Sequence, residues 1–254
     1  MSDQRWNRAL VTGASSGIGR AFARLLAERG TDLVITARDG ERLRALAEEL
    51  GDRVIVEVIE ADLADRTAVD GLVDRLEAAE APVDLLVNNA GFGFAGEFID
   101  LDRNAETAVV DVNIVALHRL AHAAGAAMAS RGRGGILNVS SVAGAGPAPR
   151  AATYAATKAF VTSFSKALHV ELGPMGVVVS CLCPGLTRTE FQERAGSPSD
   201  DIPRVMWQSA DHVARAGLDG LNRGKPVVTP GALNKVLTAG LGMAPLGLID
   251  RFRR

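Results

Sequence analysis

Short apolar segments alternate with amphipathic segments from the first ten residues nearly to the end of the chain. The apolar segments are rich in Val, Ile and Leu, as are strands that are buried on both faces of a parallel sheet. They read ALVTG, DLVITA, RVIVEVIEA, VDLLVNNAG, GGILNVSS, VVVSCLCPG and PVVTPG. This alternation predicts an α/β fold, with a doubly wound parallel sheet of about seven strands and helices on both of its faces.

The amphipathic segments repeat apolar residues every three or four positions, which is typical of helices that cover a sheet. Examples are GRAFARLLAERG, ERLRALAEELG and DRTAVDGLVDRLEAAE. Gly30 and Gly51 follow two of them and are expected to end those helices. No internal repeat, low-complexity linker or charge block divides the chain. We therefore expect one domain over residues 1–254, a usual length for an undivided α/β domain.

Composition and charge limit the classes of partner. Hydrophobic residues make up 47% of the chain and charged residues 23%, which is ordinary for a globular protein. The formal net charge of -2 argues against a nucleic-acid partner or a membrane surface held by bulk electrostatics. The first residues, MSDQRWNR, lack the apolar region of a signal peptide, and no apolar run is as long as a membrane span. We expect a cytoplasmic protein with no membrane span.

Two cysteines and two histidines have spacings that invite a metal or disulfide interpretation. Cys181 and Cys183 lie two apart in a predicted strand, and we expect their side chains on opposite faces, buried and unlinked. His118 and His122 have metal-ligand spacing on a helix, but no glutamate lies between them and no third ligand is evident. The sequence therefore predicts no metal site.

A glycine-rich segment follows the first predicted strand. Thr12 leads into GASSGIG, which places Gly13, Gly17 and Gly19 at the start of a helix. Glycine allows a tight turn and a close approach to a ligand, and a helix N-terminus offers free N–H groups to a phosphate. Three glycines alone could form only a turn, but this position at a strand end predicts a dinucleotide site.

Tyr154 is the only tyrosine in the chain, and Lys158 follows it by four residues. On a helix the two side chains share a face, with their Cβ atoms about 5–6 Å apart. Such a pair is most often an amphipathic packing pair. A nearby ammonium also lowers the pKa of a phenol from about 10, which improves proton transfer near neutral pH. The pair alone leaves packing and catalysis open.

Five motifs follow one another at the predicted strand ends and around the tyrosine. They are TGASSGIG, NNAG at 88–91, NVSS at 138–141, YAATK, and PGLTRTEF. Each is weak by itself, but in this order they make the chain similar to the short-chain dehydrogenase/reductase family in its short single-domain form. The resemblance implies a Rossmann-like NAD(P)-binding domain and an oxidoreductase that interconverts a ketone or aldehyde and an alcohol.

The resemblance also implies catalytic roles. Tyr154 matches the general acid/base, and Lys158 matches the residue that lowers its pKa and binds the nicotinamide ribose. Ser141 matches the serine that holds the substrate oxygen, with Ser140 as the alternative. Asn113 matches the asparagine of a water-linked proton path to the lysine. In the oxidised complex, the positive nicotinamide would add to the effect of Lys158 on the phenol pKa.

Cofactor contacts are implied at the ends of five predicted strands. Asp62 fits the acidic residue near the adenine, Thr189 fits the contact to the nicotinamide carboxamide, and Thr187 is a second candidate for that contact. Asn88 and Asn89 could instead form only a turn. Besides Tyr154 and Lys158, the implied cofactor-binding residues are Gly13, Ser15, Ser16, Gly17, Ile18, Gly19, Arg38, Asp62, Leu63, Asn89, Ala90, Gly91, Pro184, Gly185, Thr187 and Thr189.

The end of the second strand predicts a preference for NADP(H) over NAD(H). Ala37 takes the position of the acidic residue that binds the adenosine ribose, and Arg38 follows it. A charge-assisted hydrogen bond from Arg38 to the 2′-phosphate is worth about 1.5–3 kcal/mol, or roughly ten- to hundredfold in affinity. If the register is shifted by one residue, Asp39 meets the ribose instead.

The substrate side is less defined. The resemblance implies a lid near residues 189–210, and Phe92 and Phe94 either line the pocket or pack under their loop. We expect a small-molecule ketone or secondary alcohol in an apolar or mixed pocket. The tail from residue 226 is expected to pack on the body or a partner subunit, and a membrane-surface anchor is the alternative. By resemblance, the protein is a homodimer or homotetramer that pairs through residues 102–130 and 151–173.

Two other functions fit the same fold. One is a catalytically silent NADP(H)-binding redox sensor, although such proteins characteristically lose the Tyr and Lys pair that this chain keeps. The other is reduction of a carbon–carbon double bond, although the related enoyl reductases space their Tyr and Lys further apart. The physiological substrate is not predicted.

Overall fold

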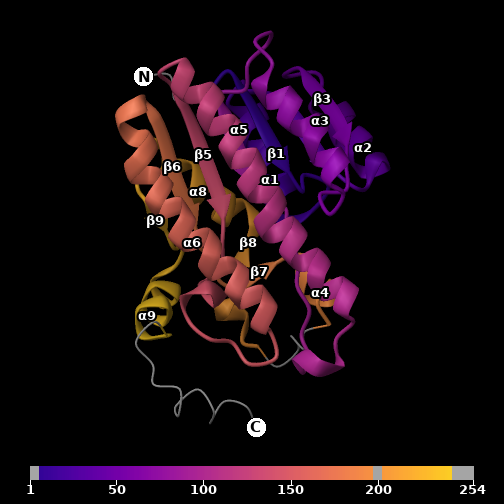
Figure 1. The fold of residues 1–254 in the computed structure, drawn as a ribbon, viewed down its shortest axis with the longest axis vertical. Coiled ribbons are helices and arrows are strands. Elements are labelled where there is room, and N and C mark those ends of the chain that lie inside the picture. The colour runs from indigo at the N-terminus through magenta and orange to yellow at the C-terminus, as the bar shows by residue number, and fades with distance from the viewer. Residues whose placement is uncertain (1–5, 197–201, 242–254) are drawn as a thin grey trace.

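The computed structural model describes residues 6–196 and 202–241, and it confirms the predicted fold (Figure 1). Seven parallel strands form one sheet in the order β3-β2-β1-β4-β5-β6-β9. The strands are β1 Arg8–Thr12, β2 Asp32–Ala37, β3 Val56–Glu60, β4 Leu85–Asn88, β5 Gly134–Val139, β6 Val177–Leu182 and β9 Val227–Val228. The strand order reverses between β1 and β4, and the carboxyl ends of strands at such a point form the usual ligand crevice of this architecture.

Helices cover both faces of the sheet. One apolar cluster packs α1, α2 and α8 against it, and a second packs α3, α5 and α6 against the other face, where α5 and α6 are prominent in Figure 1. These helices are α1 Gly17–Glu28, α2 Gly40–Leu50, α3 Arg66–Glu77, α5 Leu117–Ser130, α6 Ala152–Leu172 and α8 Ala210–Asn222. In β1, Ala9 and Val11 belong to the first cluster and Leu10 to the second, so the strand is buried on both sides. This explains its uninterrupted apolar sequence.

Shorter elements gather at the carboxyl end of the sheet. They are α4 Arg103–Val110, β7 Thr187–Arg188, α7 Phe191–Arg194, β8 Gln208–Ser209 and α9 Ala232–Leu241. β7 and β8 pair as a separate two-stranded sheet. The tail beyond residue 241 and residues 197–201 of the expected lid lie outside the described residues.

The two glycines expected at helix ends lie there. Gly30 follows Arg29, the C-cap of α1, and has a φ of 74°, a backbone conformation that glycine adopts without steric cost. Gly51 caps α2 with a right-handed φ of -62°, so its backbone does not require glycine.

A six-residue π-helix, Asp111–Ala116, joins α4 to α5. A π turn bonds residue i to i+5 in place of i+4, which changes the direction of the side chains around it. Asn113 lies within this turn and is completely buried. The sequence predicts a helix here but not its altered hydrogen bonding.

A row of polar side chains crosses the apolar interior. Asn88 at the end of β4 donates from Nδ2 to Asn138 Oδ1 in β5 at 3.0 Å. Asn138 Nδ2 donates to Ser165 Oγ in α6 at 3.0 Å, and Ser165 Oγ donates to the Val161 carbonyl at 2.7 Å. Because every member is paired, the row carries little of the cost of burying polar groups.

The expectation that Cys181 and Cys183 point to opposite faces is wrong. Their Sγ atoms lie 3.7 Å apart, and both thiols are buried and unlinked. Residues two apart on a strand share a face, because successive side chains alternate. Thr162 Oγ1 lies near both sulfur atoms, at 3.8 Å and 3.9 Å.

Within the described part of the chain, no cluster of three or more His, Cys, Asp or Glu side chains has an arrangement that could hold a metal ion. The ring of His118 instead packs against Phe164, with ring centroids 5.4 Å apart. Among the same residues, no helix has both the length and the apolar character needed to cross a membrane.

Candidate active site

The predicted dinucleotide turn lies where β1 and β4 end side by side. Thr12 Oγ1, at the end of β1, accepts hydrogen bonds from the backbone N–H groups of Asn89 and Ala90 at 3.0 Å and 2.9 Å. Asn89 Nδ2 donates to the Thr12 carbonyl at 2.9 Å. These bonds fix the NNAG segment against the glycine-rich turn.

The glycine-rich turn forms a cradle that side chains would fill. Gly13 and Gly17 have positive φ values of 67° and 53°. A Cβ atom on Gly19 would lie 2.1 Å from the Gly13 carbonyl oxygen, so this position admits no larger residue. The Ser16 side chain makes no capping hydrogen bond to α1. The free N–H groups and the open cradle fit the pyrophosphate of a dinucleotide.

Four predicted catalytic residues converge beside this cradle. A Cβ atom on Gly91 would lie 3.0 Å from both Asn113 Oδ1 and Lys158 Nζ, so the π turn and α6 meet at the end of β4. Ser141, after β5, hydrogen-bonds with the Tyr154 hydroxyl. Lys158 Nζ donates to the Val139 carbonyl at 3.0 Å and lies 5.7 Å from the centroid of the Tyr154 ring.

Asn113 is fixed by three hydrogen bonds. Its Oδ1 accepts from the Phe92 N–H at 3.1 Å, and its Nδ2 donates to the Phe92 carbonyl at 2.9 Å and to Thr157 Oγ1 at 3.0 Å. The amide therefore ties the segment after β4 to α6, one residue before Lys158.

Ser140 and Ser141 face different groups. Ser140 Oγ donates to the Lys158 carbonyl at 2.7 Å and lies 2.8 Å from Thr162 Oγ1. Ser141 Oγ accepts from the Ala143 N–H at 3.1 Å and is hydrogen-bonded with Tyr154. The geometry favours Ser141 over Ser140 as the residue that contacts a reacting oxygen.

The electrostatics of the pair differ from those predicted. Burial raises the pKa of Tyr154, and its hydrogen bond with Ser141 opposes this increase. Burial lowers the pKa of Lys158 to about 8, and the neighbouring thiols Cys181 and Cys183 act in the opposite direction. In this structure burial dominates the pKa of both groups, because desolvation disfavours the charged form of each.

A pH dependence of stability follows from Lys158. Its pKa of about 8 in the folded protein lies below the value of about 10.4 for a free lysine. Between these values the unfolded chain binds more protons, so the free energy of unfolding increases with pH. We expect a gain of about 1–2 kcal/mol from about pH 8 to about pH 9.5, measured by urea unfolding. Lys158→Met should lack this gain. If the free energy of unfolding increased equally with pH in both proteins, the lowered pKa of Lys158 would be contradicted.

Arg38 and Asp39, which follow the end of β2, have different surroundings. The Asp39 carboxylate caps α2 by accepting from the Arg42 N–H at 3.0 Å, and it also lies 3.3 Å from Arg42 Nε. Arg38 is exposed and forms no ion pair with any described residue. At the end of β3, Asp62 Oδ1 accepts from the Ala64 N–H at 3.0 Å, and Asp62 is exposed beside the buried Leu63.

The segment after β6 carries the residues that were predicted to contact the nicotinamide. The Pro184 carbonyl accepts from the Val142 N–H at 2.9 Å, and a Cβ atom on Gly185 would lie 2.4 Å from the Asn234 amide. Thr187 is buried and donates to the Gly185 carbonyl at 3.0 Å. Thr189 faces the cradle, since its Cγ2 lies 3.0 Å from the position of a Cβ atom on Gly17.

Aromatic side chains lie on the segments that follow β4 and β7. The Phe92 and Phe94 rings pack edge to face with centroids 5.7 Å apart, and the Phe191 ring lies 5.3 Å from the Tyr154 ring. A Cβ atom on Gly93 would lie 2.7 Å from Tyr154 Cδ2. Sequence reasoning missed Phe191 and Gly93, although Phe191 ends the PGLTRTEF motif.

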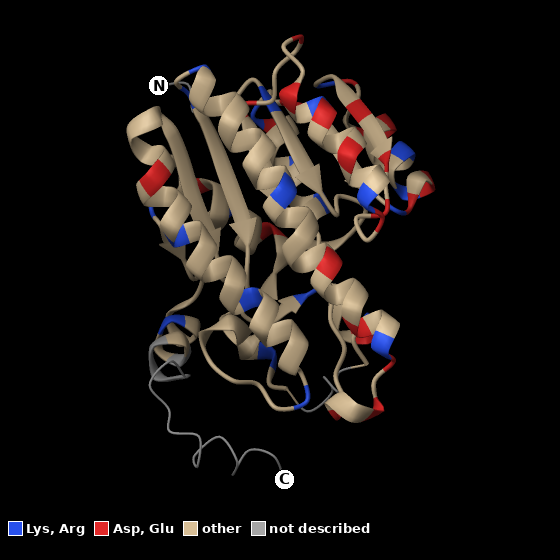
Figure 2. Ribbon diagram, in the orientation of Figure 1, with Lys and Arg blue, Asp and Glu red and all other residues tan. Residues whose placement is uncertain are grey.

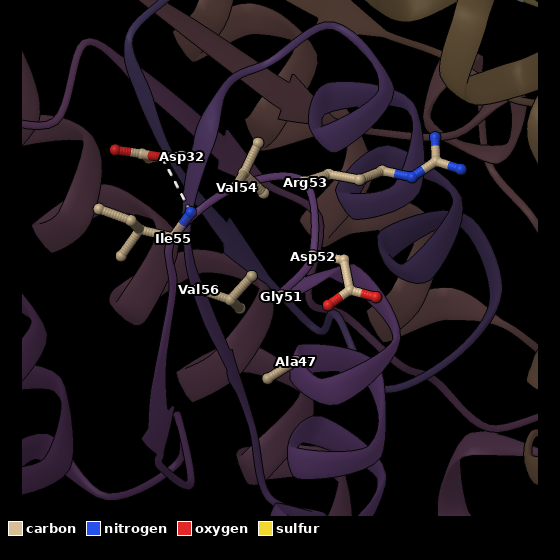
Figure 3. Close-up of a pocket in the computed structure, with 8 residues that line it drawn as sticks. All are labelled: Asp32, Ala47, Gly51, Asp52, Arg53, Val54, Ile55 and Val56. Carbon is tan, nitrogen blue, oxygen red and sulfur yellow. Dashed lines mark hydrogen bonds between the residues drawn. The ribbon is translucent and has the colours of Figure 1, made fainter.

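A separate surface hollow lies between α2 and the start of β3 (Figure 3). In it, the Ile55 N–H donates to Asp32 Oδ1 at 3.0 Å. Asp32 and Val56 are the first residues of β2 and β3, so the hollow lies at the amino ends of the strands, opposite the cradle. It contains none of the predicted site residues.

Comparison with known proteins tests the family. Residues 7–200 match the family described as short chain dehydrogenase. The chain belongs to this family. As a short chain dehydrogenase it is an oxidoreductase, and the family resemblance drawn from the five motifs is confirmed.

Three relatives of this short chain dehydrogenase are informative. Sulfoacetaldehyde reductase 2 of Chromohalobacter salexigens is 42% identical over 184 residues, which are 72% of this chain and 73% of the relative. The structure of a Sphingobium yanoikuyae short-chain dehydrogenase in complex with NADPH has a TM-score of 0.85 and 38% identity, covering 96% of this chain and 95% of that one. A bulky-bulky ketone specific alcohol dehydrogenase from Comamonas testosteroni has a TM-score of 0.81 and 33% identity, covering 98% and 93%.

Proposed function

We propose that this short chain dehydrogenase is an NADPH-preferring oxidoreductase that interconverts a ketone or aldehyde and an alcohol, with Tyr154 as general acid/base. The observation that carries the proposal is the convergence of Asn113, Ser141, Tyr154 and Lys158 beside the glycine cradle. The whole chain, residues 1–254, serves as one NAD(P)-binding domain, with a lid near residues 189–210.

The protein groups supply proton transfer and positioning. The bound nicotinamide supplies or accepts the hydride at the carbonyl carbon. Ser141 and Tyr154 hydroxyls are hydrogen-bonded to each other, so both can reach one substrate oxygen. The raised pKa of Tyr154 keeps the phenol protonated and ready to donate a proton during reduction. The Lys158 ammonium can replace that proton, and Asn113, which lies beside the same Gly91 position, holds the neighbouring segment in place through its hydrogen bonds.

The relatives support a carbonyl substrate. One named relative reduces an aldehyde, sulfoacetaldehyde, and another is an alcohol dehydrogenase specific for bulky ketones. The Phe191 ring, with its centroid 5.3 Å from that of Tyr154, places an apolar group beside the proposed acid/base. We propose a small-molecule ketone or aldehyde whose non-reacting part is at least partly apolar.

The test of the reaction is NADPH oxidation by the purified protein with a panel of ketones, aldehydes, quinones and β-keto thioesters. Turnover of any carbonyl compound supports the proposal, and parallel assays with NADH measure the cofactor preference. Tight NADPH binding without turnover across the panel would instead favour the redox-sensor function.

Arg38 carries the proposed preference for NADPH. Asp39 is engaged in capping α2, whereas Arg38 has no ion-pair partner in the described structure and is free to bind a 2′-phosphate. The Sphingobium yanoikuyae relative is described in complex with NADPH. A cation without an acidic partner at this strand end favours the phosphorylated cofactor.

Replacing this arginine should change the cofactor preference. Arg38→Gln removes a charge-assisted hydrogen bond, so we expect NADPH affinity to fall about ten- to hundredfold while NADH affinity stays within about twofold. Fluorescence titration of both cofactors measures this. Arg53→Gln is a matched control, because Arg53 lies in the hollow at the opposite ends of the strands. Equal losses of affinity for both cofactors would show that Arg38 does not bind the 2′-phosphate.

We also propose that the protein is a homodimer or homotetramer that pairs through α4, α5 and α6. The outer surfaces of α5 and α6 carry few charges (Figure 2). Phe160 is 36% exposed and Val170 72% exposed on α6. The Phe160 and Phe164 rings stack with centroids 5.5 Å apart, which forms an apolar surface suited to a second copy of the chain.

A further inference from the structure

An ion pair joins the first turn of α2 to the segment that follows β6. Arg42 Nη1 donates to both carboxylate oxygens of Glu190, at 3.0 Å each. Arg42 lies in the first turn of α2, four residues after Arg38, whereas Glu190 caps α7 and directly follows Thr189. The pair therefore spans 148 residues of sequence and connects the expected 2′-phosphate position to the nicotinamide side.

The segment that carries Glu190 contacts the active site on both of its sides. The preceding residue, Thr189, lies against the Gly17 position at the start of α1. The following residue, Phe191, packs on the ring of Tyr154. Any shift of Glu190 therefore acts on the cradle through one neighbour and on the proposed acid/base through the other.

Arg42 keeps one donor group available. Its Nη1 is bonded to Glu190, and its Nε faces Asp39. Its Nη2 has no hydrogen-bond partner in the described part of the chain. A guanidinium presents five N–H donors in a planar fork, so Arg42 can hold Glu190 and a phosphate oxygen at the same time. The side chains are 47% and 43% exposed, so the pair is open to a ligand at the surface.

The charges around Glu190 support a stable position for its carboxylate. The hydrogen bond from Arg42 is the main cause that lowers the pKa of Glu190, and the charges of Arg194 and Arg20 act in the same direction. Arg194, on the next turn of α7, also forms an ion pair with Glu190. When a phosphate also engages Arg42, the Glu190 carboxylate still has Arg194 and Arg20 as cationic neighbours.

We propose that Arg42 is a second cation for the 2′-phosphate and that Glu190 couples this phosphate to the active site by holding Thr189 and Phe191 in place. The inference rests on the proposed function, since it names a further residue that selects NADPH and a positioning residue for the same reaction. The 2′-phosphate fixes the guanidinium, and the guanidinium fixes the segment that contacts Tyr154. The contact between Arg42 and the 2′-phosphate should therefore increase the affinity for NADPH over NADH. It should also improve the binding of the carbonyl substrate when NADPH is bound.

The first experiment titrates NADPH and NADH into the full-length protein and needs no turnover. Arg42→Gln should weaken NADPH at least about tenfold and NADH less than about twofold. Arg44→Gln is the matched control, because Arg44 lies two residues further along α2 and pairs with Glu60 at 3.6 Å. Equal losses for both cofactors, or the same loss in Arg44→Gln, would overturn the role of Arg42. This result stands even if the proposed reaction is wrong.

The second experiment measures the KM of a turned-over carbonyl compound at saturating cofactor. Glu190→Gln should raise this KM about two- to fivefold with NADPH, as expected for loss of an exposed ion pair, and leave NADPH affinity within about twofold. Glu193→Gln, in the same short helix, is the matched control and should change neither quantity.

The double variant, with both Arg42→Gln and Glu190→Gln, measures the coupling between these two residues. If Glu190 acts through Arg42, Glu190→Gln should have no further effect on KM in the Arg42→Gln background. Arg42→Lys should recover part of the NADPH affinity but not the coupling, because an ammonium cannot bind two anions in a planar fork. Additive effects of the two substitutions on KM would overturn the proposal.

Discussion

Tyr154→Phe is expected to reduce kcat for carbonyl reduction by about a hundred- to ten-thousandfold. The phenol is the proposed proton donor, and a positioned general acid contributes a factor of this size. The ring keeps its contacts with Phe191 and with Gly93, so the pocket retains its shape. NADPH affinity should stay within about threefold, because the hydroxyl removed hydrogen-bonds with Ser141 and not with the glycine cradle. Steady-state kinetics and a fluorescence titration measure the two quantities.

Substitutions of Ser141 and Ser140 are the controls for Tyr154→Phe. Ser141→Ala should also lower kcat, since its hydroxyl is bonded with Tyr154. Ser140→Ala should keep kcat within a few fold, because its hydroxyl bonds the Lys158 carbonyl, which also accepts from Thr162. Activity of Tyr154→Phe within tenfold of the wild type would exclude Tyr154 as the proton donor.

Gly19→Ala is expected to abolish tight cofactor binding. Its Cβ atom would lie 2.1 Å from the Gly13 carbonyl oxygen and 2.6 Å from Asn89 Nδ2, so the turn must move. Two lost charge-assisted hydrogen bonds to the pyrophosphate, worth about 1.5–3 kcal/mol each, reduce affinity at least about a hundredfold. Overpacking should also lower the free energy of unfolding by about 1–3 kcal/mol. Calorimetric NADPH titration and urea unfolding test both effects.

Gly71→Ala is the matched control for a glycine in a helix. Gly71 lies exposed in α3, and a Cβ atom there would meet nothing within 4 Å. Alanine should therefore stabilise the protein by about 0.5–1 kcal/mol and leave NADPH binding unchanged. If Gly19→Ala bound NADPH as tightly as Gly71→Ala, the cradle would not be the pyrophosphate site.

The features predicted correctly from sequence are those that neighbouring residues specify. The strands β1, β2, β4, β5 and β6 contribute buried residues to both apolar clusters, so their apolar runs predicted most of the seven-stranded sheet directly. The glycine-rich turn and the Tyr154–Lys158 pair are each contained in fewer than ten residues, and family membership followed from their order. The roles of individual site residues stay predictions that the substitutions above test.

The features missed from sequence depend on contacts between distant segments. The π turn at Asn113 leaves no periodic signal, because it changes one hydrogen-bond ring within a continuous helix. The raised pKa of Tyr154 comes from burial, which the assembled pocket determines. The contact of Phe191 with Tyr154 joins segments 37 residues apart. The error at Cys181 and Cys183 was of another kind, since strand geometry alone puts their side chains on one face.

The buried row of Asn88, Asn138 and Ser165 has a consequence for how the chain folds. Apolar strands such as β4 and β5 attract one another in any register, because apolar contacts are not directional. Asn88 is the register partner of Asn138, and their amides bond only in that alignment. A slip by one residue would break the bond between the two amides, and each buried polar group left unpaired costs about 1–3 kcal/mol. The polar row thus selects the native strand pairing against misfolded alternatives that bury the same apolar surface.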